Sequence, residues 1–184
     1  MEHVFAAFLV VAIILELFDL NLKRKMLVKR WQSVLFSMFS TAFLAGLFIL
    51  LGLLASDLLP DMEMHIRVYF SIALLFLLTF YGFRRDKSYA DAGGLAYANF
   101  GLFMLIGLGK SILYMIIGLV IGMSGTNEIW FAKSFLFAVI VFGIALLLTN
   151  KPFSRILGIP LPWLKALLYG LSAVSLAYQF ILQV

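Results

Sequence analysis

The chain has 184 residues, of which 64% are hydrophobic and 12% charged, and it contains no cysteine. Soluble domains are about 45–50% apolar and about 25% charged, so the composition excludes a water-soluble globular protein. Without cysteine there is no disulfide, thiolate metal site or thiol nucleophile, and two histidines are too few for a histidine-rich metal or haem site. We therefore expect an integral membrane protein without a metal or cofactor.

Uncharged stretches predict the membrane spans, because about 20 helical residues cross the hydrocarbon core of a bilayer. The apolar runs cover residues 4–22, 31–56, 68–83, 92–127, 129–150 and 161–184. They are too long for barrel strands and show no two-residue alternation. The sequence predicts an all-α integral membrane protein, a bundle of six transmembrane helices that forms one polytopic domain over residues 1–184.

The charges between these runs predict the orientation of the bundle. The connections after the first, third and fifth runs hold ten basic residues: Lys23, Arg24, Lys25, Lys29, Arg30, Arg84, Arg85, Lys87, Lys151 and Arg155. The other connections hold Asp57, Asp61, Glu63, Glu128 and one basic residue, Arg67. Because basic loops stay in the cytoplasm, we expect both termini on the non-cytoplasmic side, most simply in a bacterial inner (plasma) membrane. The net charge of +5 is thus a topology signal, and no nucleic-acid partner is expected.

The fourth run leaves a second topology open. It has 18 uncharged residues before Lys110 and 17 after it. A turn at residues 107–110, Gly-Leu-Gly-Lys, would divide it into two short helices and make seven spans. That version places Lys151 and Arg155 on the side of the acidic loops, so the loop charges favour six.

Lys110 lies near the middle of a predicted helix from Phe100 to Met123. A lysine at the centre of a membrane helix costs about 2.5–3.5 kcal/mol on insertion scales, so a carboxylate, carbonyl groups or a wet cavity should offset that cost. The functional interpretation is a binding or gating charge that faces the bundle interior. The alternative is a side chain that snorkels to the cytoplasmic surface.

Glu16 and Asp19 are the natural partners of that lysine. They lie three residues apart, on one face of the first helix, and Glu16 falls at the depth of Lys110. We therefore predict a Glu16–Lys110 ion pair, either as a proton- or cation-linked site or as a structural pair between helices. A further alternative has both carboxylates bonding the basic loop at residues 23–30.

Other polar residues complete the expectations. Asn99 and Tyr114 join Lys110, Glu16 and Asp19 as candidate binding residues, since they could line a cavity. Lys165, beside Trp163, is expected to be a cytoplasmic interfacial anchor, and Asn21 and Gln32 are expected at the interface. Gly118-x-x-x-Gly122 is typical of close helix packing, within one chain or between copies.

The sequence favours a small membrane transporter or channel. Its partners would be the lipid bilayer and a second copy or another membrane protein, because six short helices leave little room for a pathway. The first alternative is an accessory or assembly subunit of a larger membrane complex. The second is a membrane-embedded lipid-modifying enzyme, in which Asp86 and Asp91 with Arg84, Arg85 and Lys87 could hold a lipid phosphate, although the spans contain no histidine, cysteine or recognisable nucleophile–base set.

Overall fold

The computed structural model describes residues 4–28, 30–59, 62–84, 95–149, 155–156 and 159–183. Within these ranges the chain is helical apart from one antiparallel pair of two-residue strands, β1 (Arg155–Ile156) and β2 (Ile159–Pro160). The helices are α1 (Val4–Leu27), α2 (Trp31–Asp57), α3 (Met64–Arg84), α4 (Leu95–Ala98), α5 (Phe100–Gly109), α6 (Ser111–Met123), α7 (Glu128–Leu148) and α8 (Leu161–Gln183).

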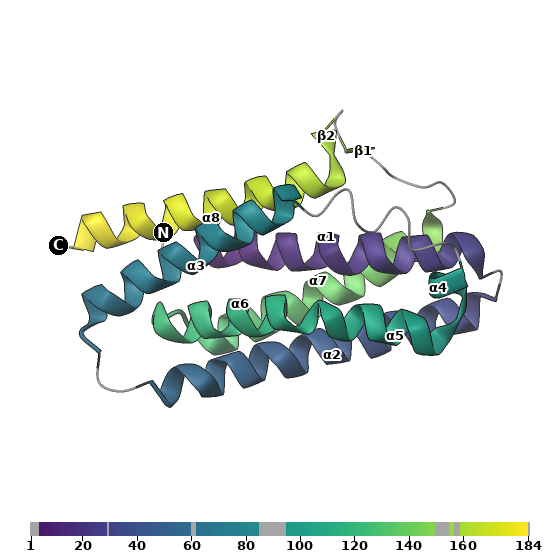
Figure 1. Ribbon diagram of the computed structural model, residues 1–184, viewed down its shortest axis with the longest axis horizontal. Helices are drawn as coiled ribbons and strands as arrows, with labels where there is room; N and C mark the ends of the chain where they lie inside the picture. The colour runs from purple at the N-terminus through teal and green to yellow at the C-terminus, as the bar shows by residue number, and fades with distance from the viewer. Residues whose placement is uncertain are drawn as a thin grey trace.

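Six helical segments of the described chain are long and apolar enough to cross a membrane, which indicates a multi-pass membrane protein. The fourth of these segments is Phe100–Met123, in which α5 continues into α6 through Lys110. Lys110 keeps a right-handed helical backbone (φ −89°, ψ −10°), and its N–H still donates to the carbonyls of Ile106 and Gly107. The chain does not reverse at residues 107–110 (Figure 1), so the seven-helix alternative is wrong.

The six long segments run along one axis in alternating directions, and both termini lie toward the same end of the bundle (Figure 1). We call this the terminal end, and it also holds the α2–α3 and α6–α7 connections. The opposite end, which holds the α1–α2 and α7–α8 connections, is called the basic end. α1 is the central helix. Of the residues in its 18-residue apolar stretch, 67% are buried inside the bundle, compared with 22% for the corresponding stretches of α3 and α7.

Helices α1–α3 and α5–α8 pack in corresponding ways. α1 packs against α7 and α8, while α6 packs against α2 and α3, and α3 also lies along α8. If α1 corresponds to α5–α6, α2 to α7 and α3 to α8, then these contacts exchange with one another, whereas the contact between α1 and α2 has no counterpart of similar extent between α6 and α7 in the described part of the chain. Corresponding helices run in opposite directions (Figure 1), so the two halves have inverted topology.

The α2–α6 contact depends on glycine. A Cβ added at Gly118 would overlap the carbonyl of Ile49, and one added at Gly52 would overlap the carbonyl of Met115. One at Gly122 would overlap the hydroxyl of Ser56. The Gly118-x-x-x-Gly122 face therefore serves close packing within the chain, one of the two uses that the sequence left open.

Candidate functional site

Glu16 is the centre of a buried charge cluster that three helices form. Its Oε1 pairs with the Lys110 ammonium, at the junction of α5 and α6. Its Oε2 accepts a hydrogen bond of 2.5 Å from Lys165 Nζ on α8. The three residues are only 5%, 7% and 8% exposed, respectively. One carboxylate thus holds two ammonium groups and connects α1 to both α6 and α8.

The predicted Glu16–Lys110 ion pair is confirmed. The two residues pair between helices that run in opposite directions (Figure 1), and both are buried inside the bundle. The alternative in which Lys110 snorkels to the surface is wrong, because the side chain is buried.

Lys165 is not the interfacial anchor that the sequence predicted. Its side chain is buried against α1, whereas Trp163, two residues earlier, is 55% exposed. Lys165 shares one face of α8 with Tyr169 and Ser172, both of which are buried. Lys110 has a tyrosine at the same spacing, Tyr114, and this shared Lys-x-x-x-Tyr pattern is the signal that could have identified Lys165.

Asp19 extends the cluster toward the basic end. Its Oδ2 accepts from Lys165 Nζ at 3.5 Å and from Lys23 Nζ at 3.2 Å. The side chain is 17% exposed, so this part of the cluster is closer to solvent than Glu16. The sequence offered the alternative that Glu16 and Asp19 bond to the basic residues 23–30. The contact with Lys23 confirms this for Asp19. Together the three ammonium groups and two carboxylates carry a formal charge of one positive unit.

The other two candidate binding residues, Asn99 and Tyr114, differ in where they lie relative to the charge cluster. Asn99 is exposed and caps α5, where its Oδ1 accepts from the backbone N–H groups of Gly101 and Leu102 at 2.9 and 3.4 Å. Tyr114 is buried one turn beyond Lys110, on the same face of α6. The structure therefore brings Glu16, Asp19 and Lys110 together, adds Lys165 and leaves Asn99 outside the cluster.

Asn21, which the sequence predicted at the membrane interface, is fully buried within the bundle. Its amide donates to the carbonyl of Leu17 at 2.8 Å and to Thr41 Oγ1 at 2.9 Å. The hydroxyl of Ser37 donates to Asn21 Oδ1 at 3.3 Å. α1 continues to Leu27, past the end of the uncharged run, so Asn21 lies inside the bundle, against α2.

Arg24 and Lys25, which the sequence predicted in the first loop, belong to the last turns of α1. Their side chains form hydrogen bonds from this end of α1 to α4 and to the end of α7. Arg24 is buried, and its guanidinium donates to the carbonyl of Tyr97 at 2.8 Å and lies 4.8 Å from the centre of the Phe103 ring. Lys25 Nζ donates to the carbonyls of Leu146, Leu147 and Thr149 at 2.6, 3.0 and 2.5 Å. An ammonium group at these carbonyls complements the C-terminal end of α7.

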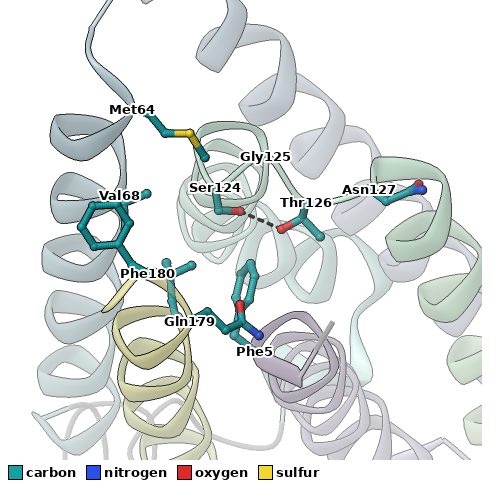
Figure 2. A pocket seen from close by; sticks show the side chains of 10 residues that line it. Phe5, Met64, Val68, Ser124, Gly125, Thr126, Asn127, Gln179 and Phe180 are labelled. Atoms are coloured by element: carbon teal, nitrogen blue, oxygen red, sulfur yellow. Dashed lines mark hydrogen bonds between the residues drawn. The ribbon is translucent and has the colours of Figure 1, made fainter. Parts of the chain in front are cut away.

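A cavity of about 370 Å³ opens at the terminal end, between the first turns of α1 and α3, the α6–α7 connection and the last turns of α8. Ser124 Oγ and Thr126 Oγ1, 2.8 Å apart, lie on one side, opposite Val68 and Phe180 (Figure 2). No charged side chain of the described residues lines it. The cavity therefore lies at the terminal end, away from the charge cluster in the middle of the bundle.

The residues considered for a lipid-phosphate site, Asp86 and Asp91, lie outside the described residues. Among the described residues, no three histidine or carboxylate side chains are grouped so that they could hold a metal ion. Comparison with protein families, with curated proteins and with solved structures finds no match.

Proposed function

We propose that this protein is a small membrane transporter or channel whose transport route passes the charge cluster at Glu16, Lys110 and Lys165. The observation that supports the proposal is the burial of three charged side chains in the middle of a membrane helix bundle. Each such charge is costly in hydrocarbon, and apolar side chains could join the same helices without that cost. Intramembrane charges that face a bundle interior are typical of ion, proton and solute pathways.

The cluster also suggests how transport could be coupled to a change of conformation. Glu16 holds Lys110 and Lys165 through separate carboxylate oxygens. A proton on Glu16, or an anionic group that competes for the lysines, would weaken the connections of α1 to α6 and α8. A ligand that binds more tightly to the state with these connections broken would shift the population toward that state.

The inverted topology of the two halves supports a transporter. In many secondary transporters, inverted repeats surround a central site, and one half moves against the other. Glu16 and Lys110 lie at the middle of corresponding helices, α1 and α5–α6. The cluster therefore lies where such a site is expected.

The proposal includes the orientation and the location. With the basic end in the cytoplasm, Lys23, Lys25 and Arg30 lie on the inner side, while Asp57 and Glu128 lie on the outer side, as the positive-inside rule requires. We place the protein in a bacterial inner membrane as a homo-oligomer or with a membrane protein partner.

The test is a flux measurement on the purified protein in liposomes, with internal reporters for protons, potassium and chloride. We expect a protein-dependent flux that falls at least about tenfold in Glu16→Gln and in Lys110→Gln, because each replacement removes a charge from the route. Lys23→Gln is the matched control, since the Lys23 side chain is 48% exposed and pairs only with Asp19 in the described chain. Equal fluxes in wild type and both cluster variants would contradict the proposal.

An accessory or assembly subunit is the second candidate. It is favoured by the two direct lysine partners of Glu16 and by the position of the cavity at the terminal end, away from the cluster. In that case the cluster would be a structural connection between helices. A membrane protein that co-purifies in constant ratio in mild detergent, with no flux from the isolated chain, would support this candidate.

A further inference from the structure

We infer that the cavity at the terminal end is the entrance site for a small uncharged solute with hydrogen-bonding groups, and that an apolar gate closes it off from the charge cluster. The inference rests on the proposed transport function, because it supplies the outer end of the route. It differs from that proposal in that neither the entrance nor the gate involves Glu16 or Lys110.

The lining of the cavity determines the class of solute. The hydroxyl groups of Ser124 and Thr126 lie on one side, Val68 and Phe180 on the other, and Gln179 lies beside Phe5 at the base (Figure 2). The lining thus combines hydroxyl and amide groups with apolar side chains, and about 370 Å³ is near the lower end of the size range of ligand sites. A charged solute would lose its hydration without gaining a partner of opposite charge. The cavity therefore suits a small uncharged molecule such as a polyol or an amide.

On each of three helices, α1, α6 and α8, one face extends from the cavity to the charge cluster. On α6, Ser124 lies fourteen residues from Lys110, and on α8, Gln179 lies fourteen residues from Lys165. Fourteen residues are close to four helical turns, about 21 Å, so each pair shares a face. On α1, Phe5 and Glu16 are eleven residues apart, close to three turns. The cavity and the cluster are thus two ends of one interior route.

The middle of this route is apolar and closed. The side chains between the two ends, on the same three faces, are all buried and belong to one hydrophobic core: Leu9, Ile13, Ile117, Ile121, Ala173 and Leu176. Hydrophobic constrictions of this kind gate pores by excluding water. Tyr114 and Tyr169 follow on the cluster side of the constriction. The structure thus has an open outer site and a shut gate.

The absence of cysteine allows a direct test of the entrance. Single cysteines replace Ser124 in the cavity, the half-buried Ser40 on α2 and Leu58 in the connection at the terminal end, all in proteoliposomes. Each is reacted with three methanethiosulfonates that differ only in the group they carry: neutral hydroxyethyl, anionic sulfonatoethyl and cationic trimethylammonioethyl. Rates at Ser124→Cys are divided by the rates at Leu58→Cys, which corrects for intrinsic reactivity.

We expect the normalised rate at Ser124→Cys to be at least about tenfold higher for the hydroxyethyl reagent than for either charged reagent, because no charged side chain of the described residues lines the cavity. Ser40→Cys, which is half-buried within the apolar segment Trp31–Asp57, should react with neither charged reagent. Equal normalised rates would overturn the solute class. No reaction at Ser124→Cys, with Leu58→Cys reactive, would overturn the entrance itself.

The gate is tested with Ser172→Cys, since Ser172 is fully buried on α8 below Leu176. We expect no reaction with any of the three reagents, and reaction at least about tenfold faster after Ile121→Ser and Leu176→Ser, because hydroxyl groups would let water enter the constriction. Reaction of Ser172→Cys without these changes would overturn the gate. An unchanged rate at Leu58→Cys and an unchanged gel-filtration profile would show that the gate variant is folded. Failure of the Glu16 flux test would leave these outcomes unaffected, so the two proposals fail separately.

Discussion

Glu16 on α1 and Lys165 on α8 form a buried hydrogen bond of 2.5 Å between residues 149 positions apart in the sequence. Because the other oxygen of the same carboxylate pairs with Lys110, this contact makes Glu16 the shared partner of two helices. The loss of Glu16 should therefore affect the molecule more than the loss of either lysine alone.

Glu16→Gln should lower the free energy of unfolding by about 3–5 kcal/mol, because it removes the carboxylate that pairs with Lys110 and Lys165, and Lys165 keeps only its longer contact of 3.5 Å with Asp19. Lys165→Gln should cost less, since Glu16 keeps Lys110. The measurement is reversible unfolding in mixed micelles. Asp19→Asn is the matched control, as its side chain is partly exposed and its ion pairs should contribute less. A loss in Glu16→Gln no greater than that in Asp19→Asn would show that the cluster does not stabilise the bundle.

Replacement of the whole triad should separate stability from function. In Glu16→Leu, Lys110→Met, Lys165→Met, apolar side chains fill the cluster and no buried charge is left over, so stability should return to within about 1–2 kcal/mol of wild type or exceed it. Flux in liposomes should nevertheless be lost. A folded triple variant that keeps wild-type flux would favour the structural role of the cluster.

Gly118→Val should disrupt the contact between α2 and α6, because any side chain at this position overlaps the backbone at Ile49. We expect a loss of about 3 kcal/mol or more in the free energy of unfolding, at the upper end of the cost of overpacking. The control is Gly109→Val, where an added Cβ would meet no atom within 4 Å. Since the Gly118-x-x-x-Gly122 face packs within the chain, an oligomer of Gly118→Val should dissociate no more readily than an oligomer of the wild type. Selective loss of the oligomer in a stable chain would contradict this assignment.

Lys25→Met should loosen the end of α7, since the Lys25 ammonium bonds three carbonyl groups there. A cation at a helix C-terminus contributes about 0.3–1 kcal/mol, and up to about 2 kcal/mol when partly buried. Hydrogen exchange of the amides at residues 145–149 should therefore become faster, by about two- to thirtyfold. Lys23→Met, which removes an exposed lysine two residues earlier, should leave this exchange unchanged, and equal acceleration by both variants would argue against capping.

The orientation can be tested with two single cysteines in cells. An impermeant maleimide should label Leu58→Cys at the terminal end in intact cells, and Gln32→Cys at the basic end only after permeabilisation. Both side chains are exposed, so burial should not limit either reaction. The opposite pattern would show that the basic end faces outward.

The sequence by itself predicted the six long helices, since a span needs only enough consecutive uncharged residues, and this is a property of the chain taken in order. It also predicted the Glu16–Lys110 pair, because the position of a residue within its span determines its depth in the bundle. The helix ends were less accurate: α1 runs to Leu27, beyond the uncharged run, because its last turn is stabilised by contacts of Arg24 and Lys25 with other helices.

Only the tertiary structure decided which face of each helix turns inward. Lys165 and Asn21 have the sequence positions of interfacial residues, yet both are buried, because α8 packs along α1 and α1 packs against α2 on those faces. The cavity depends in the same way on segments from four parts of the chain that meet at one end of the bundle. Depth along a helix follows from residue order, but direction around the helix axis follows from packing between helices, and in an almost uniformly apolar sequence little in the pattern distinguishes one face from another.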